Sequence, residues 1–203
     1  MSGVSTLFWD VGGVILTNGW DRTSRKLASE QFGLDWEEYQ DRHELSFPAF
    51  EMGALTLDQY LDRTIFYRSR PFSRDDFAAF MFAQSRELPE SRAVLTRLAR
   101  GGRYFLATIN NEARELNQRR VERFGLRNEF RAFFSSCYVG LRKPEAGIYK
   151  LALDVTQRDP QECLFIDDRA LNLECAGKLG MRTIHFQNAA QLQEELRRHG
   201  VAA

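Results

Sequence analysis

The feature that most constrains the fold is a regular alternation of apolar runs and amphipathic segments after Leu88. Amphipathic stretches that end at glycine are typical of helices, and short apolar runs between them are typical of buried strands. Predicted helices cover residues 89–102, 110–125, 144–156, 171–180 and 191–200, and predicted strands cover 104–109, 162–168 and 182–186. Another short apolar stretch lies at 137–139. This alternation predicts a doubly wound parallel α/β sheet, a Rossmann-like core with crossover helices.

An all-helical stretch separates the first apolar run from the alternating part of the chain. Residues 6–16 predict another buried strand, broken at an Asp-Val-Gly-Gly turn, whereas residues 21–87 contain no convincing strand. We therefore expect a helical-bundle cap at residues 17–88. It would be inserted after the first strand of an α/β core that consists of residues 1–16 and 89–203.

Helix start and stop signals support this cap. Thr56 with Gln59 and Ser73 with Asp76 are two capping boxes, in which side chains satisfy the free backbone donors of a helix start. An earlier helix is expected to end before Pro48, because proline lacks a backbone donor. Four helices of ordinary length fit the cap.

Charge and cysteine content narrow the possible partners. The 203 residues include 28 Lys and Arg against 28 Asp and Glu, so we expect no broad nucleic-acid surface. Three cysteines without a Cys-x-x-Cys pair fit reduced thiols, and three scattered histidines do not suggest a zinc site. No signal-peptide pattern or membrane span is recognisable. We expect a soluble cytoplasmic protein without nucleic-acid or membrane partners.

Polar side chains gather where the predicted strands end, which is where open α/β sheets bind ligands. Together with one lysine from a loop, they are Asp10, Thr108, Asn110, Asn111, Lys143, Asp167 and Asp168. Taken singly, the asparagines and the paired aspartates could cap helices, and the lysine could be a surface residue. Their convergence on one edge of the sheet points to a functional site.

This set of side chains suits phosphoryl transfer. Carboxylates from two strands can hold Mg²⁺, a hard cation that prefers oxygen ligands, and Lys143 would offset phosphate charge. Thr108 or Asn110, with free amides at the next helix start, would bind another phosphoryl oxygen. Asp10 could then attack phosphorus as a covalent carboxylate nucleophile.

Four motifs of the chain resemble those of the haloacid dehalogenase-like hydrolases, in that family's order. FWDVGGVI is similar to the first motif, FLATINN to the second, GLRKPEAGIY to the third and LFIDDRALN to the fourth. Within the family, the chain resembles the bacterial sugar-phosphate phosphatases and the N-terminal phosphatase domain of soluble epoxide hydrolases. The resemblance covers the whole chain when residues 17–88 are counted as the cap.

The resemblance implies a role for each strand-end residue. Asp10 would be the nucleophile and a Mg²⁺ ligand, Gly12 would bind Mg²⁺ through its carbonyl, and Asp168 would be the direct carboxylate ligand of the fourth motif. Lys143 matches the lysine of the third motif. Asp167 would orient Lys143 or a metal-bound water.

Two positions stay open in this comparison. Asn172, one helical turn beyond Asp168, could support the site or could simply be a polar residue early in a helix. Many phosphatases of the family carry an acid–base Asp two residues after the nucleophile, where this chain has Gly12. General acid–base help is worth about 10²–10⁴-fold, so this glycine should slow substrates with poor leaving groups.

The second motif can be aligned in two registers. The family has Ser or Thr followed by Asn after an apolar strand. Aligning on Thr108 places Ile109 at the Asn position, whereas aligning on Asn110 restores the Asn as Asn111 but replaces the hydroxyl with an amide. We favour the second register because its strand stays apolar up to the motif.

We therefore expect a Mg²⁺-dependent phosphatase that hydrolyses a small phosphorylated metabolite through an aspartyl-phosphate intermediate. A metal-independent dehalogenase is a second possibility, because a departing halide needs no proton. A low-turnover binding or regulatory protein on the same fold is a third. The cap should select the substrate, and six of its residues are candidates to face the pocket: Asn18, Trp20, His43, Glu44, Tyr67 and Arg68.

Overall fold

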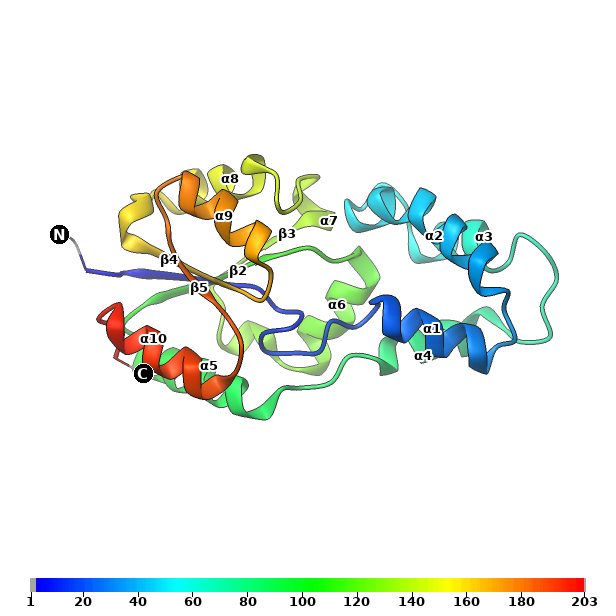
Figure 1. The fold of residues 1–203 in the computed structure, drawn as a ribbon, viewed down its shortest axis with the longest axis horizontal. Coiled ribbons are helices and arrows are strands. Elements are labelled where there is room, and N and C mark those ends of the chain that lie inside the picture. The colour runs from blue at the N-terminus through cyan, green and yellow to red at the C-terminus, as the bar shows by residue number, and fades with distance from the viewer. Residues whose placement is uncertain (1–2, 203) are drawn as a thin grey trace.

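The computed structural model describes residues 3–202 and contains one five-stranded sheet between layers of helices. The strands are β1 (Thr6–Trp9), β2 (Phe105–Asn110), β3 (Ala132–Ser135), β4 (Cys163–Asp167) and β5 (Arg182–His185). All neighbouring strands pair in parallel, in the order β3-β2-β1-β4-β5. Figure 1 shows this sheet among its helices. The predicted doubly wound α/β core is confirmed.

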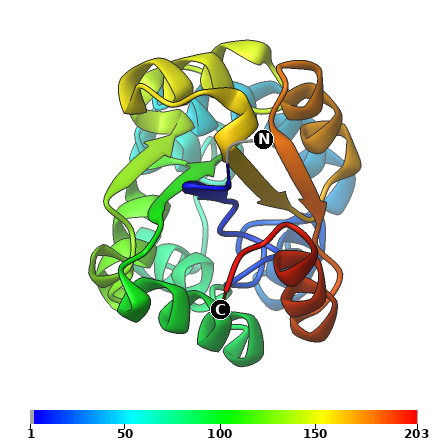
Figure 2. The ribbon, with the colours of Figure 1, turned by 90° about the vertical axis from the view of Figure 1, so that its left-hand side faces the viewer.

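Helices cover both faces of this sheet (Figure 2). They are α5 (Pro89–Gly101), α6 (Arg114–Arg123) and α10 (Ala189–Arg198) on one face, and α8 (Ala146–Thr156) and α9 (Ala170–Lys178) on the other. Successive residues of β1 serve opposite faces: Leu7 and Trp9 pack with α5 and α10, whereas Phe8 packs with α8 and α9. Because both faces are buried, the strands read as continuous apolar runs.

Four helices lie beyond the carboxyl ends of the strands, away from the described ends of the chain (Figure 1). They are α1 (Arg22–Gln31), α2 (Trp36–Glu51), α3 (Leu57–Thr64) and α4 (Arg74–Ala83). They share an apolar cluster that includes Phe50, Tyr60 and Phe77 and extends to Ala113 and Leu116 of the core. The cap boundaries at residues 17 and 88 stay a prediction. None of the helices described within residues 3–202 has the length and apolar character that crossing a membrane requires.

The predicted end of α2 before Pro48 is wrong, because the helix continues to Glu51. Proline removes only its own N–H from the helix, and the carbonyl of Pro48 still accepts from the Met52 amide at 3.1 Å. Burial of Phe50 in the cap core holds this last turn in place. Both predicted capping boxes, those that begin at Thr56 and Ser73, are formed.

Two further differences from the sequence prediction lie near the strand ends. The third strand is Ala132–Ser135, and the apolar stretch at 137–139 belongs instead to a short helix, α7 (Ser136–Val139). The helix predicted from residue 110 begins only at Arg114, since Asn110 is the last residue of β2. The three residues between them form a loop that helps to line the site.

Candidate active site

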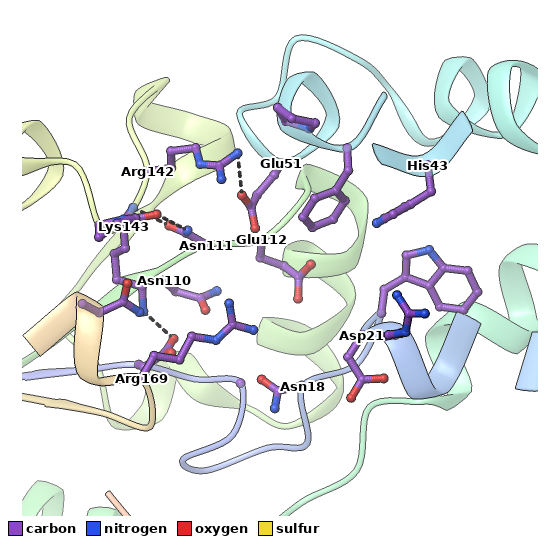
Figure 3. Close-up of a pocket in the computed structure, with 18 of the residues that line it drawn as sticks. Asn18, Asp21, His43, Glu51, Asn110, Asn111, Glu112, Arg142, Lys143 and Arg169 are labelled. Carbon is purple, nitrogen blue, oxygen red and sulfur yellow. Dashed lines mark hydrogen bonds and ion pairs between the residues drawn. The ribbon is translucent and has the colours of Figure 1, made fainter. Parts of the chain in front are cut away.

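A cavity of about 560 Å³ lies between the strand ends and the cap (Figure 3). Core residues in its lining include Asp10, Gly12, Asn110, Asn111, Lys143 and Asn172. Cap-side residues in its lining include Asn18, Trp20, His43, Glu44 and Glu51. The structure therefore brings most of the sequence-predicted site residues to one place.

Asp10 follows β1 directly and is held there by its neighbours. Its amide donates to the Ile166 carbonyl of β4 at 2.8 Å, so the carboxylate is fixed at the sheet edge. Its Oδ1 accepts from the Val11 amide at 2.7 Å and lies 2.9 Å from Lys143 Nζ. Both of these contacts use Oδ1, which leaves Oδ2 for a metal or a substrate.

Lys143 is buried between two carboxylates. Its Nζ lies 2.9 Å from Asp10 Oδ1 and 2.7 Å from Asp167 Oδ2. Asp167 in turn accepts from Asn172 Nδ2 at 3.0 Å on both oxygens and from the Arg169 amide at 2.8 Å. Asp167 thus orients Lys143, and Asn172 supports Asp167 from the first turns of α9. Asn172, whose role the sequence left open, thus lies against Asp167.

Asp168 completes a group of three carboxylates. One oxygen from each of Asp10, Asp167 and Asp168 lies within 4.8 Å of the others. Asp168 Oδ1 is buried and has no hydrogen-bond partner within residues 3–202. A divalent cation that prefers oxygen ligands, such as Mg²⁺, would provide a partner for this oxygen.

Gly13 makes room for Asp168, a contact that the sequence analysis missed. Its φ is +76°, and a Cβ at this position would lie 2.6 Å from Asp168 Cγ. No other residue type could occupy this turn without displacing the carboxylate. The paired glycines after Asp10 were the signal for such a close approach.

The charges of this cluster do not balance. Burial raises the pKa of Asp10 to about 7, against the opposing effect of Lys143. Burial and the neighbouring Asp167 also raise the pKa of Asp168. Burial lowers the pKa of Lys143, but Asp10 and Asp167 outweigh it and raise that pKa overall, so the ammonium form is favoured. One ammonium group facing three carboxylates leaves an excess of negative charge that a cation would relieve.

These observations fit Mg²⁺ as the group that this site would hold. Asp10 and Asp168 have carboxylate oxygens free of protein partners, whereas both oxygens of Asp167 are already used. Gly12 lines the same cavity. Asp10 and Asp168 are therefore the carboxylates suited to bind the metal, and the Gly12 carbonyl stays a predicted third ligand.

The second motif divides its residues between buried and cavity-lining positions. Thr108 is fully buried and is absent from the described cavity lining, whereas Asn110 and Asn111 belong to it. Asn111 exchanges two hydrogen bonds with the backbone of Lys143, at 2.9 and 2.8 Å. The side-chain nitrogen of Asn110, Nδ2, is buried and has no hydrogen-bond partner in the described chain. Asn110 is thus the better candidate to bind a phosphoryl oxygen, and Asn111 positions Lys143.

Arg120 of α6 forms hydrogen bonds with both chain segments that connect the core with the cap, at Thr17 and at Ser85. Its Nε donates to Ser85 Oγ at 2.9 Å, its Nη2 donates to the Thr17 carbonyl, and its Nη1 lies 2.7 Å from Glu112 Oε2. Arg120 and Glu112 are both buried and both line the cavity. Arg120 was not predicted as a site residue, because its contacts with Ser85 and Thr17 join positions far apart in the chain.

Among the six cap candidates, four were predicted correctly and two were not. Asn18, Trp20, His43 and Glu44 line the cavity. Tyr67 and Arg68 do not belong to the described lining: the Tyr67 ring packs under the Arg42 guanidinium at 3.4 Å, and Arg68 pairs with Glu38. Tyr67 and Arg68 lie in the turn after α3, and their contacts attach this turn to α2 at the cap surface.

His43 belongs to a buried polar network in the cap. Trp20 Nε1 donates to the Tyr60 hydroxyl at 3.0 Å, and that hydroxyl lies 2.8 Å from His43 Nδ1. Burial, together with Arg25, lowers the pKa of His43 to about 3. The imidazole is therefore neutral at physiological pH, and its ring points toward the cavity (Figure 3).

Comparison with known proteins agrees with this geometry. A family model described as haloacid dehalogenase-like hydrolase matches residues 4–180. Bifunctional epoxide hydrolase 2 of Sus scrofa is 26% identical over 215 residues, which covers 93% of this chain and 37% of that protein. Glyceraldehyde 3-phosphate phosphatase of Pyrococcus abyssi is 33% identical over 107 residues, which covers 52% of this chain and 44% of that protein. The chain thus spans less than half the length of these curated relatives.

A solved structure shows the same fold. It is a HAD family enzyme of Bacteroides thetaiotaomicron in complex with magnesium and inorganic phosphate. The superposition has a TM-score of 0.77 at 21% identity and covers 92% of this chain and 96% of that one. At this level of identity the likeness concerns the fold alone.

Proposed function

Because this chain belongs to the haloacid dehalogenase-like hydrolase family, we propose that it is a Mg²⁺-dependent phosphatase for a small phosphorylated metabolite. The observation that carries this proposal is the buried Asp10, paired with Lys143 and placed within 4.8 Å of two further carboxylates. That group combines a nucleophile, a fixed ammonium and an excess of negative charge. The nucleophile and the ammonium would act on the phosphate, and the negative charge would hold a metal ion that offsets the phosphate charge.

Each of these side chains would have a separate role in the reaction. Asp10 attacks phosphorus and becomes an aspartyl phosphate, and water then hydrolyses that intermediate. Lys143, held by Asp167 and Asn111, offsets charge on the phosphoryl oxygens, and the unpartnered Asn110 amide donates to one of them. Mg²⁺ bound at the carboxylates would neutralise further phosphoryl charge.

Two similarities support a phosphatase in particular. The Pyrococcus abyssi relative is a phosphatase by name, and the Bacteroides enzyme with this fold was solved with magnesium and phosphate. Three free cysteines, Cys137, Cys163 and Cys175, are consistent with a reducing compartment, and we propose a cytoplasmic location. The identity of the metabolite depends on the cap.

Two other activities compete with this proposal. A dehalogenase on this fold would explain Gly12, because a halide leaves without a proton, but it would leave the carboxylate cluster without a purpose. A binding protein with little turnover would keep the fold and the cavity. The carboxylate cluster favours the phosphatase over both.

One experiment separates the three activities. Purified protein is incubated with a panel of phosphorylated metabolites, with Mg²⁺ or with a chelator, and in parallel with 2-chloropropionate. Phosphate release that requires Mg²⁺ is the expected result. Halide release that is insensitive to the chelator would establish the dehalogenase, and binding without release of either product would establish the binding protein.

A further inference from the structure

Position 12 holds a glycine where many phosphatases of this family place an acid–base carboxylate, and neighbouring side chains already approach it closely. A Cβ on Gly12 would lie 3.2 Å from Asn18 Oδ1 and 3.6 Å from Arg120 Nη1. Arg120 already pairs with Glu112. Unactivated esters therefore need the proton for their leaving group from a group other than residue 12.

Four carboxyl groups besides Asp10 belong to the described cavity lining, and three of them are already used. Asp21 caps α1 by accepting from a backbone amide at 2.8 Å. Glu44 accepts from a glutamine of its own helix at 3.0 Å. Glu112 is paired with Arg120 at 2.7 Å. The fourth, Glu51, is different.

Glu51 is the last residue of α2, and its side chain enters the cavity from the cap side (Figure 3). It is 8% exposed, and within residues 3–202 its carboxylate makes one polar contact, an ion pair with Arg142 Nη1 at 3.4 Å. This distance is long for a charge-assisted hydrogen bond, so the carboxyl group is free to bond to a substrate oxygen.

The charged groups that face Glu51 come from three loops of the core. They are Arg142 and Lys143 before α8, Glu112 after β2, and Arg169 after β4. Helix α7, which packs on α2, has no charged side chain. Burial raises the pKa of Glu51 to about 7, against the opposing effect of Arg142. A carboxyl group with such a pKa can both donate and accept a proton near neutral pH.

We infer that Glu51 is the general acid and general base of the reaction, in place of the carboxylate missing at position 12. This inference rests on the proposed phosphatase function. It also gives the cap a direct part in catalysis, because the acid would reach the leaving group only when the cap covers the phosphate held by the core.

The reaction would have two steps, formation of the aspartyl phosphate and its hydrolysis. In the first, an Asp10 oxygen forms a bond to phosphorus, the bond to the ester oxygen breaks, and that oxygen takes the Glu51 proton and leaves as an alcohol. In the second, water attacks phosphorus and gives its proton to the Glu51 carboxylate. The Asp10–phosphorus bond breaks, and Asp10 and protonated Glu51 are restored as phosphate leaves.

The test compares native protein, Glu51→Gln and the control Glu37→Gln, which changes an exposed glutamate of the same helix. Rapid-mixing kinetics under saturating Mg²⁺ use 4-nitrophenyl phosphate and an alkyl phosphate. Glu51→Gln should release the first equivalent of nitrophenol at nearly the native rate and then slow, because only the second step needs the base. Its turnover of the alkyl phosphate should fall by about 10²–10⁴-fold. Glu37→Gln should match the native protein.

A pH profile gives a second readout that a purely structural role would not change. Native kcat/KM for the alkyl phosphate should fall above pH about 7, since Glu51 must be protonated in the free enzyme. Glu51→Gln should lose this decline. Arg142→Gln removes a cation that opposes the raised pKa, so it should move the decline to higher pH.

The outcomes are distinguishable. If Glu51→Gln slows the first turnover of both esters equally, or slows neither, Glu51 is not the acid even though the protein is a phosphatase. If native protein hydrolyses no phosphate ester with Mg²⁺, the proposed function and this inference fail together. Thermal unfolding of each variant verifies that the fold is retained.

Discussion

The core face and the cap face of the cavity are built in different ways. On the core face, Lys143 lies within 2.9 Å of two buried carboxylates, Asp10 and Asp167. Hydrogen bonds from the Val11 amide and from the Asn172 side chain fix these two carboxylates in turn. On the cap face, Glu51 has one ion pair of 3.4 Å, and His43 belongs to a neutral network. The core face is rigid and charged, whereas the cap face is more loosely paired.

This difference indicates a division of tasks. A preorganised set of charges stabilises a transition state without reorganisation, which suits the phosphoryl group that all candidate substrates share. Loosely paired side chains can exchange partners with a substrate. Core variants should therefore impair every substrate, and cap variants should change substrate preference and pH dependence.

The largest effect should come from Asp10→Asn. The amide keeps the shape of the side chain but cannot act as the carboxylate nucleophile, so turnover should fall on the order of 10⁴–10⁶-fold for every phosphate ester. Phosphate release and circular dichroism measure activity and fold. The control is Asp154→Asn on the exposed side of α8. Near-normal activity of Asp10→Asn would contradict both the role of Asp10 as nucleophile and the division of tasks between the two faces.

Lys143→Ala should have the next largest effect. The variant leaves Asp10 and Asp167 buried without their cation, so turnover should fall by about 10²–10³-fold and the free energy of unfolding by about 3–5 kcal/mol. Urea titration and steady-state kinetics measure both quantities. Lys150→Ala, at an exposed position of α8, should change neither. If Lys143→Ala lowered activity for some esters only, the contrast between the faces would be wrong.

Gly13→Ala tests whether the core face holds Mg²⁺. In this variant the methyl group displaces Asp168, whereas Gly33→Ala places a methyl at φ +60° in open space. Both variants should lose about 1–2 kcal/mol from backbone strain. Mg²⁺ at about 100 times its Kd should stabilise native protein and Gly33→Ala by about 2.7 kcal/mol in thermal unfolding, but not Gly13→Ala. Equal stabilisation of both variants would place the metal elsewhere.

The core half of the site could be predicted from sequence because parallel strands bring their carboxyl ends to one edge. Asp10, Lys143 and Asp168 follow from that rule and from local motifs. β3 could not be predicted, because an edge strand of four residues with adjacent phenylalanines has too little periodicity. Phe134 packs on one face of the sheet and Phe133 against the other.

Glu51 and Arg120 escaped prediction for a tertiary reason, although four other cavity-lining residues on the cap side were predicted correctly. Glu51 reaches the cavity only because α2 continues past Pro48, which depends on the burial of Phe50 in the cap core. Arg120 contacts Thr17 across 103 positions of the chain, and no local pattern predicts such a contact. Local motifs therefore identify the chemistry, and long-range packing decides what surrounds it.

The prediction with the smallest effect near neutral pH concerns the cap face and its response to acid. The pKa of His43 is lowered to about 3 by burial and by Arg25, whereas the unfolded chain binds this proton near pH 6.5. Between these values the unfolded state binds more protons, so stability should decrease as pH falls, by up to about 1.4 kcal/mol per pH unit from this residue.

Urea unfolding at several pH values, for native protein and His43→Gln, measures the contribution of His43 as the difference between the two proteins. The pH-dependent part of that difference should vanish above pH 7, where His43 is neutral in both states. A native slope unchanged by His43→Gln would mean that the network around Tyr60 accommodates the charged ring, and that the cap face shares the charged character of the core face.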